Sequence, residues 1–235
     1  MQITKKLVLV LGFLICFTIS GFADENKAQT IEKASPAEQI SYALGYNIFD
    51  QLKTSLDLDL KYFMMGAEDS SGNKLKISSE KLQQLLVSAR QMARDRQMEK
   101  IKKQADANRA AGEKFLKANR LKKGVVTLPS GLQYKILKTG TGPVPKLSDT
   151  VECNYRGTLI DGTEFDSSYK RGKPASFQVE GVIKGWVEAL QMMNVGSKWK
   201  LYIPADLAYG DRGAGQVIKP GSTLVFEVEL LNIVK

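Results

Sequence analysis

The sequence predicts an α+β protein: an N-terminal helical dimerisation domain, a long connecting α-helix, and a C-terminal antiparallel sheet wrapped on one short helix. Two observations predict this fold. Apolar residues recur at helical spacing as far as Met92, and no Pro or Gly interrupts the chain between Gly72 and Gly112. After Gly124 the apolar residues alternate instead, which is typical of strands.

The first 23 residues have the features of a secretory signal. Lys5 and Lys6 form a basic start, residues 7–19 are mostly apolar, and Gly21-Phe22-Ala23 supplies small residues for cleavage. A membrane anchor is the alternative, but a helix needs about 20 apolar residues to cross a bilayer. We expect cleavage before Asp24 and export to the periplasm or the cell surface.

The protein contains no histidine and only two cysteines. The lack of imidazole excludes the Ser-His-Asp triad, the Cys-His dyad and histidine metal sites. Because Cys16 lies in the signal, Cys153 remains alone and no intrachain disulfide is expected. We interpret Cys153 as a small core residue. An enzyme with this composition needs a reaction with little acid–base chemistry.

The positive charge is concentrated in one segment. The net charge is +9, and residues 90–123 carry 12 basic and 4 acidic residues. Such a segment can bind nucleic acid or an anionic surface. However, it has a single aromatic residue, Phe115, and no nucleic-acid motif. We therefore favour a solvated helix face and expect no nucleic-acid partner.

Two short helices are predicted before residue 78. Ser35 is a typical N-cap, with Pro36 at the first helical position and Glu38 three residues after the cap. The apolar face of the first helix contains Ile40, Ala43, Leu44, Ile48 and Leu52. A second helix is expected over residues 58–67, followed by a turn at 69–73.

A third helix, capped by Ser78 or Ser79, is predicted to reach Lys122. Its first part carries an apolar stripe that fits packing on the short helices: Leu82, Leu85, Leu86, Ala89 and Met92. Beyond Ala93 the stripe becomes polar, which is typical of a bridge between domains. A coiled coil is the alternative, but this segment lacks the apolar heptad spacing that a coiled coil requires. We expect domains at 24–77 and 123–235, with the connecting helix at 78–122.

The C-terminal domain has the alternation of a sheet. Strands are predicted around residues 132–136, 151–159, 199–203 and 224–230, with a hairpin-type turn at Asp161-Gly162. Residues 182–193 have the pattern of one short helix. One helix covering a mostly antiparallel sheet gives an α+β domain.

Five motifs follow one another in this domain: Tyr155-Arg156-Gly157, Asp161 to Ser168, Val182 to Trp186, Ala208-Tyr209-Gly210 and Leu224-Val225-Phe226. In their order and spacing they closely resemble the FKBP-type peptidyl-prolyl cis/trans isomerases. The helical first half, together with residues 128–135, is similar to the macrophage infectivity potentiator (Mip) branch of that family. The resemblance implies catalysed rotation about X-Pro bonds, without a cofactor.

This reaction fits the composition. Amide resonance sets a barrier of about 18–20 kcal/mol, and X-Pro bonds populate both isomers. Because no covalent bond breaks, neither a nucleophile nor a metal is required. Rotation weakens the resonance, so an apolar pocket favours the twisted state over the well-solvated planar amide.

The resemblance implies the site residues. The expected catalytic residues are Tyr155, Phe165, Asp166, Trp186, Tyr209 and Phe226. The expected substrate-binding residues are Val182, Ile183, Val217 and Ile218. By this resemblance Trp186 is the pocket floor, Asp166 accepts hydrogen bonds and orients its neighbours, and Tyr209 donates to the substrate carbonyl. Without the motifs, the aromatic residues would be interpreted as ordinary core.

Two positions depart from the family pattern. Ala175 stands where an aromatic residue often completes the wall, and Ala214 stands where many members have a histidine. These differences affect the expected substrate preference more than the activity. Arg171 matches a position that can pair with Asp166, and a surface arginine is the alternative.

The expected partners are proline-containing polypeptides, macrolide inhibitors of the immunophilin class and a second copy of the chain. Dimerisation through the N-terminal helices is implied by the resemblance, with Phe63, Met64 and Met65 at the interface. Excess apolar surface in these helices also favours it. Packing on the chain's own long helix is the alternative. The alternative function is a periplasmic chaperone or adhesion module in which client binding matters more than turnover.

Overall fold

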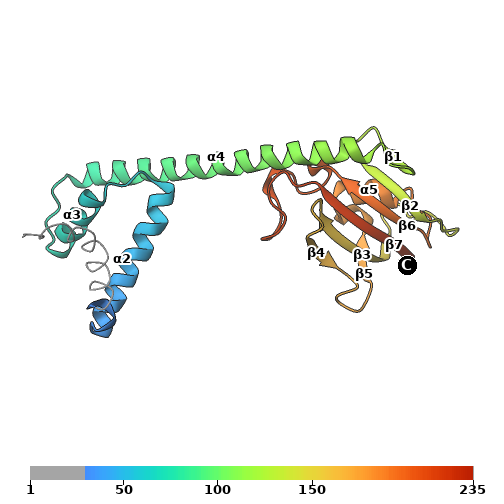
Figure 1. Cartoon of the computed structure of the whole chain (residues 1–235). Coiled ribbons are helices and arrows are strands. Elements are labelled where there is room, and N and C mark those ends of the chain that lie inside the picture. Colours follow the sequence, from blue (N-terminus) through green and yellow to red (C-terminus); the bar gives the residue numbers. More distant parts are fainter. Residues whose placement is uncertain (1–29, 235) are drawn as a thin grey trace, which may run out of the picture. The chain divides into compact units, whose positions relative to one another are not determined.

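The computed structural model of the chain describes residues 30–234 (Figure 1). They fall into two compact units, divided between Ala93 and Arg94 inside helix α4 (Ser79–Asn119). The predicted secretory signal lies outside the described residues. Within residues 30–234, no helix is long and apolar enough to cross a membrane.

The first two helices start where the sequence predicts. Helix α2 (Pro36–Ser55) begins with a capping box, in which the Glu38 amide donates to Ser35 Oγ and the Ser35 amide donates to the Glu38 carboxylate. Helix α3 (Leu60–Ser71) is capped by Asp59. The turn expected at 69–73 begins only at Gly72, because α3 continues through Ser71.

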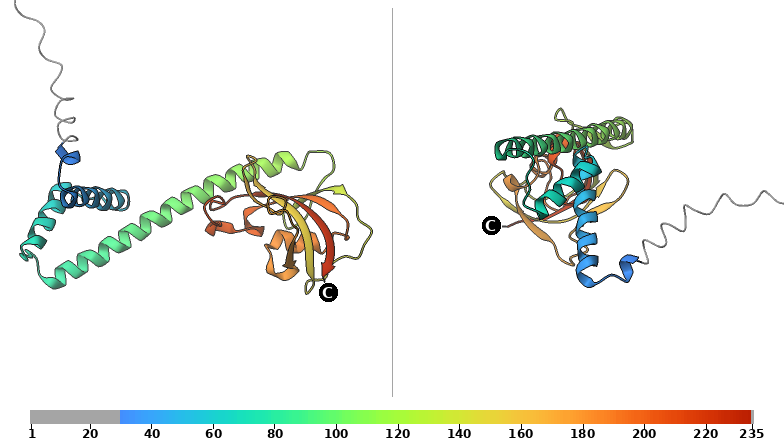
Figure 2. Two further views of the ribbon diagram at one scale, coloured as in Figure 1. Left: turned by 90° about the horizontal axis from the view of Figure 1, so that it is seen from below. Right: turned by 90° about the vertical axis from the view of Figure 1, so that its left-hand side faces the viewer.

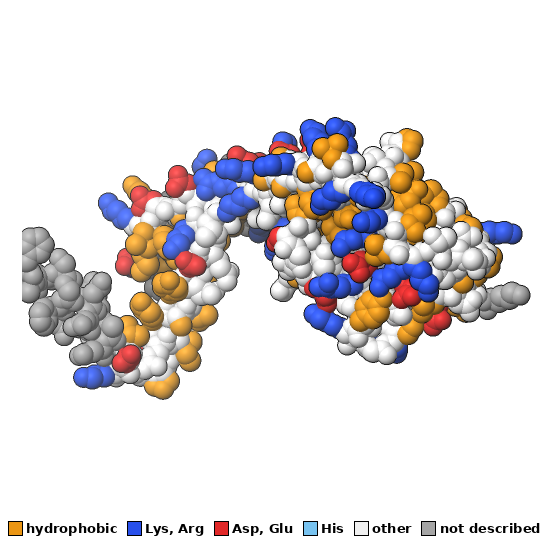
Figure 3. All heavy atoms as spheres, turned by 45° about the vertical axis from the view of Figure 1, so that its right-hand side comes forward, with side chains coloured by type: hydrophobic (Ala, Val, Ile, Leu, Met, Phe, Trp, Pro, Cys, Tyr) orange, Lys and Arg blue, Asp and Glu red, His pale blue; other side chains and the backbone are white. Residues whose placement is uncertain are grey.

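The N-terminal unit buries little apolar surface. Neither α2 nor α3 contains a buried residue, and a ring pair joins Phe49 to Phe63 at 5.4 Å. The stripe of α4 that we expected to cover these helices stays open, with Leu85 48% and Leu86 41% exposed. Figure 3 shows apolar side chains at the surface of these helices. Packing within the chain therefore does not hide them.

The C-terminal unit contains a seven-stranded antiparallel sheet within the part of the chain described. Its strands are β1 (Val125–Thr127), β2 (Gln133–Lys138), β3 (Thr150–Leu159), β4 (Glu164–Ser167), β5 (Ala175–Gln178), β6 (Lys198–Ile203) and β7 (Leu224–Val234). The order is β1-β2-β6-β7-β3-β4, and β5 pairs with β3. β1 and β5 were not predicted from the sequence, and β4 was implied only by the hairpin-type turn at Asp161-Gly162.

One face of the sheet packs on helix α5 (Lys184–Leu190), which is shorter than the predicted 182–193. Alternate residues of the strands face this helix, and Leu201 and Ile203 of β6 are fully buried with Ala189 and Leu190 of α5. Short 3₁₀ turns, η1 (Val179–Gly181), η2 (Ala205–Leu207) and η3 (Gly210–Arg212), lie between the larger elements. This core holds α5 and β7 in fixed positions beside the cavity described below.

The second half of α4 differs from the solvated bridge that we expected. Ala105, Gly112 and Asn119 lie seven residues apart, about two helical turns, and all three are buried. They face the C-terminal unit, to which residues 94–119 belong. The expectation that this half is only a bridge between domains is therefore wrong, because one face docks on the C-terminal unit, while its other faces are exposed as the predicted solvated face.

The last turns of α4 cover the sheet face opposite α5, as Figure 2 shows. Asn119 Nδ2 donates to Gln133 Oε1 at 2.9 Å, and Gln133 Nε2 donates to the Leu116 carbonyl at 3.0 Å. The Phe115 ring lies 6.0 Å from that of Tyr202. Gln133 and Tyr202 pair in register, so α4 caps the β2–β6 ladder.

Candidate active site

A cavity of about 550 Å³ opens between β3, α5 and the loop that joins β6 to β7. All ten site residues predicted from the sequence line it: Tyr155, Phe165, Asp166, Val182, Ile183, Trp186, Tyr209, Val217, Ile218 and Phe226. Phe177, Gly181, Ala214, Gly215 and Gln216 also contribute. Residues far apart in the sequence are thus brought together around one space.

Trp186 lies at the centre of a box of aromatic rings. It is the third residue of α5 and is only 4% exposed. Its ring meets Tyr155 at 5.4 Å and 88°, and Phe226 at 5.3 Å and 84°. Such edge-to-face contacts are favourable for aromatic pairs and hold each ring in one orientation. The box is therefore rigid as well as apolar.

Phe177 on β5 completes the box, although it is not among the residues predicted from the sequence. Its ring meets Trp186 at 5.5 Å and Tyr155 at 5.6 Å. Ala175, where we looked for an aromatic wall residue, packs partly buried against the core and does not line the cavity. Phe177 follows two positions later on the same strand. That alternation was the signal that could have identified it.

A polar network closes one side of the box. The Tyr155 hydroxyl donates to Asp166 Oδ2 at 2.5 Å, and Arg171 Nη1 donates to Asp166 Oδ1 at 2.5 Å. Arg171 Nη2 also donates to the Tyr155 hydroxyl at 2.6 Å. The pairing of Arg171 with Asp166, one of two alternatives from the sequence, is therefore present. The three groups fix one another at the rim of an apolar site.

The network sets the charge states of its members. Burial alone would raise the pKa of Asp166, but the hydrogen bonds from Tyr155 and Arg171 outweigh it and hold the pKa below its ordinary value. Burial, together with the bond to Asp166, raises the pKa of Tyr155. The site thus holds a carboxylate and a neutral phenol at neutral pH. Burial also raises the pKa of the Cys153 thiol to about 12, which leaves it unreactive.

The β6–β7 loop forms the outer wall of the cavity. Tyr209 is 41% exposed at its edge, and Val217 is 40% exposed. Ala214 and Ile218 exchange backbone hydrogen bonds of 2.8 and 3.2 Å, which close the loop into a small hairpin and bury Ile218. The Tyr209 side chain is therefore partly exposed at the edge of the cavity, while Ile218 supplies apolar surface.

This arrangement suits a small apolar ring followed by a polar amide. Aromatic rings line the space, and the Tyr209 side chain lies at its edge. The cavity offers no activated nucleophile, which rotation about an amide bond does not need. An apolar space of this kind lowers the energy of a twisted amide relative to its hydrated planar form.

Fold and cavity define a prolyl isomerase, and comparison with known proteins places the chain. Residues 142–231 match the family model of the FKBP-type peptidyl-prolyl cis-trans isomerases, and residues 37–136 match the domain amino terminal to such isomerases. The chain belongs to the FKBP-type peptidyl-prolyl cis-trans isomerases. Within them it lies in the Mip-like branch, as its relatives indicate.

Two relatives and one solved structure illustrate this. The chain is 44% identical over 200 residues to the outer membrane protein MIP of Legionella longbeachae, covering 84% of this chain and 86% of that protein. It is 41% identical over 204 residues to the isomerase FkpA of Escherichia coli K12, covering 83% and 75%. The crystal structure of Escherichia coli FkpA matches with a TM-score of 0.68 and 40% identity, covering 85% of this chain and 97% of that one.

Proposed function

We propose that the aromatic cavity is the place where this isomerase binds and rotates X-Pro bonds. Trp186 is the floor under the proline ring, and Tyr155, Phe165 and Phe226 are its walls. Asp166 orients Tyr155 and Arg171, and the Tyr209 hydroxyl donates to the substrate carbonyl. The observation that carries the proposal is the set of perpendicular ring contacts around one cavity that also contains Asp166 and Tyr209.

A peptide assay tests this assignment. The chain should accelerate isomerisation of a short X-Pro peptide, and a macrolide of the immunophilin-binding class should abolish the acceleration by occupying the cavity. Trp186→Ala, which removes the floor, should weaken macrolide binding. Macrolide binding of wild-type strength by this variant would place the substrate elsewhere.

We infer that the substrates are proline-containing segments of exported proteins. The support is the predicted signal over residues 1–23, together with the name "outer membrane protein" carried by a relative. Fractionation of cells that express the tagged chain tests the location. A chain found wholly with cytoplasmic markers would remove exported clients from the proposal.

The N-terminal unit is proposed to form a homodimer. Its helices α2 and α3 bury no residue, and large apolar side chains stay half exposed or more on both, among them Tyr46 at 65% and Met64 at 50%. A second copy presents the same surface and can cover it by two-fold symmetry. Met64 and Met65 are exposed and adaptable, whereas Phe63 is partly buried against Phe49.

The same apolar surface favours a second candidate function, in which client binding matters more than turnover. Exposed apolar patches can hold unfolded segments. Asp166→Leu separates the two activities, since it removes the network beside the cavity and leaves the helices unchanged. Suppression of aggregation that survives in a variant without turnover supports a chaperone; loss of both supports isomerisation as the single function.

A further inference from the structure

The β6–β7 loop, residues 204–223, has two sides. Its inner side lines the cavity with Tyr209 and residues 214–218. Its outer side contacts the second half of α4, within the same compact unit. Contacts on the outer side can therefore control where the inner side lies.

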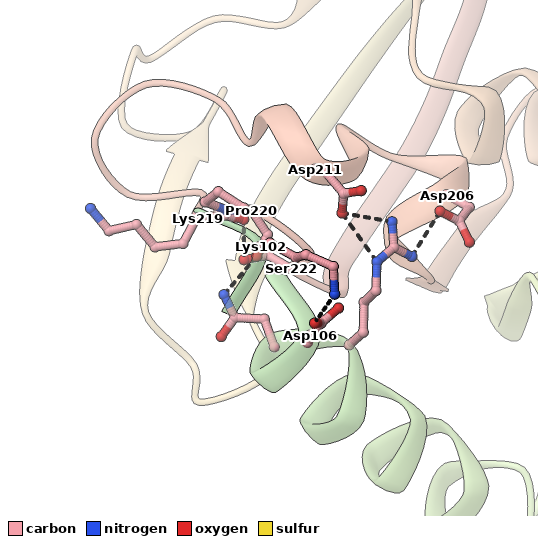
Figure 4. Close-up of polar contacts among 9 residues, drawn as sticks. Lys102, Asp106, Asp206, Asp211, Lys219, Pro220 and Ser222 are labelled. Atoms are coloured by element: carbon pink, nitrogen blue, oxygen red, sulfur yellow. Dashed lines mark hydrogen bonds and ion pairs between the residues drawn. The ribbon is translucent and has the colours of Figure 1, made fainter. Parts of the chain in front are cut away.

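Arg109 of α4 binds the loop on both sides of Tyr209. Its Nη1 donates to Asp206 Oδ1 at 2.8 Å, three residues before Tyr209. Its Nε and Nη2 donate to Asp211 Oδ1 at 3.1 and 2.9 Å, two residues after Tyr209. Figure 4 shows Asp206 and Asp211 directed toward the same guanidinium. One side chain therefore spans the segment that carries the phenol.

The solvent exposure of Arg109 and its two partners indicates a positioning role more than a stabilising one. Arg109 is 29% exposed, whereas Asp206 and Asp211 are 77% and 65% exposed. Ion pairs with such exposed partners contribute little to stability. Three charge-assisted hydrogen bonds to two carboxylates nevertheless hold a planar guanidinium in one orientation. Their main effect is on geometry.

A second anchor follows Ile218. Asn108 Nδ2 donates to the Pro220 carbonyl at 2.7 Å. At the next residue, Gly221, a Cβ would overlap the Ala105 carbonyl, and φ is +73°, which favours glycine. The loop backbone thus lies directly against the helix backbone. The cavity-lining segment is held by α4 before Tyr209 and after Ile218.

We propose that Arg109 and Asn108 are positioning residues for prolyl isomerisation. They hold the β6–β7 loop so that the Tyr209 hydroxyl and the Ile218 side chain face the bound X-Pro segment. The inference rests on the proposed role of the cavity. Neither residue lines the cavity, so both act through the loop. A hydrogen bond weakens steeply with angle and distance, so a small loop displacement lowers turnover.

The test measures turnover of a short X-Pro peptide by the full-length chain, well below its melting temperature. Arg109→Ala should lower kcat/KM about three- to tenfold, mainly through kcat. Replacing the partners, by Asp206→Asn together with Asp211→Asn, should reproduce this loss. Lys117→Ala is the matched control, because Lys117 is a cation of the same helix that pairs with Glu113 within it; turnover should not change.

A double-mutant cycle distinguishes positioning from a general loss of stability. If Arg109 acts through Tyr209, Arg109→Ala lowers kcat less in a Tyr209→Phe background than in the wild type. Independent, multiplicative effects would overturn the proposal, as would wild-type turnover in Arg109→Ala. Asp166→Leu is measured in the same assay. Wild-type turnover in Asp166→Leu would refute the proposed role of the cavity. Loss of turnover in Asp166→Leu, together with wild-type turnover in Arg109→Ala, would refute only the role of the loop contact.

Discussion

Gly112, two turns before the end of α4, lies directly against the side chain of Thr223, the residue before β7, and a Cβ on Gly112 would overlap the Thr223 hydroxyl. Thr223 is 5% exposed and cannot turn away into solvent. In the sequence, Gly112 is simply the first glycine after Gly72. The structure gives it a packing role, because the missing side chain lets α4 approach the sheet.

Gly112→Ala should therefore destabilise the chain. An exposed helical Gly→Ala change gains up to about 1 kcal/mol, but overpacking a filled contact costs about 1–3 kcal/mol. Urea unfolding should show a net loss, and Thr223→Ala in the same chain should recover part of it. Gly45→Ala is the control, since a Cβ there meets no atom within 4 Å. A more stable Gly112→Ala variant would contradict this packing.

Two substitutions in the cavity should differ in severity. Tyr209→Phe removes one hydrogen bond of about 0.5–1.5 kcal/mol, so turnover should fall only modestly. Asp166→Leu removes the acceptor of two hydrogen bonds and should lower turnover roughly tenfold or more. A protease-coupled peptide assay measures both. Equal losses in the two variants would contradict the separate roles assigned to them.

Turnover should be constant across neutral pH. Because the pKa of Asp166 is lowered, its ionised form stabilises the site fully above pH 3.8, the ordinary pKa of an aspartate. This stabilisation is lost as the pH falls from there through the lowered pKa. The raised pKa of Tyr155 keeps its phenol protonated until pH exceeds the ordinary 10.0. The rate of catalysed cis/trans exchange of an X-Pro peptide, measured by NMR, should thus stay constant from about pH 5 to 9. A midpoint near pH 6.5 would contradict this network.

The position of the cut in a fragment should decide its stability. A fragment from Arg94 keeps the helix contacts of Asn108, Gly112 and Asn119, whereas one from Leu121 loses them. We expect the shorter fragment to fold but to be less stable by about 2–4 kcal/mol, because several hydrogen bonds and a packed face are lost. It should also turn over peptides more slowly. Denaturant unfolding compares the two; equal stability would show that α4 is dispensable.

Oligomeric state should depend on the N-terminal unit. Sedimentation equilibrium should show a dimer for the chain from Asp24 and a monomer for the fragment from Arg94. Replacing Met64 and Met65 with Gln should weaken the dimer and leave turnover of short peptides unchanged, because the cavity lies in the other unit. A full-length chain that sediments as a monomer at micromolar concentration would refute the proposal.

The sequence predicted the residues of the cavity better than the elements that hold them, β5 and the second half of α4. The family resemblance that the motifs carry was enough to name ten of the residues that line the cavity, including Val217 and Ile218, which lie outside the five motifs. Phe177 was not predicted because its only signal, the alternation with Ala175, spans a strand of four residues, which is too short to be recognised as a strand by itself. A short strand depends on its partner, here β3, which the sequence alone does not reveal.

The docked face of α4 escaped for a different reason. Apolar periodicity is the usual signal of a buried helix face, and this face consists of small and polar residues such as Ala105, Asn108, Gly112 and Asn119. It packs mainly by close backbone approach and by hydrogen bonds, and Phe115 is the single aromatic residue that it contributes. Small residues are present at helical spacing, but the charged and polar residues around them give no signal of a buried face.

The place of β7 in the sheet determines how the site can form during synthesis. β7 lies between β6 and β3, yet it follows both in the sequence. A nascent chain that ends before Leu224 contains two groups of strands that are not hydrogen-bonded to each other. One consists of β1, β2 and β6, and the other of β3, β4 and β5. Such a chain also lacks Phe226. Ribosome-bound chains of this length should therefore be inactive and expose both sheet edges, and activity should appear only after β7 inserts between the ribbons.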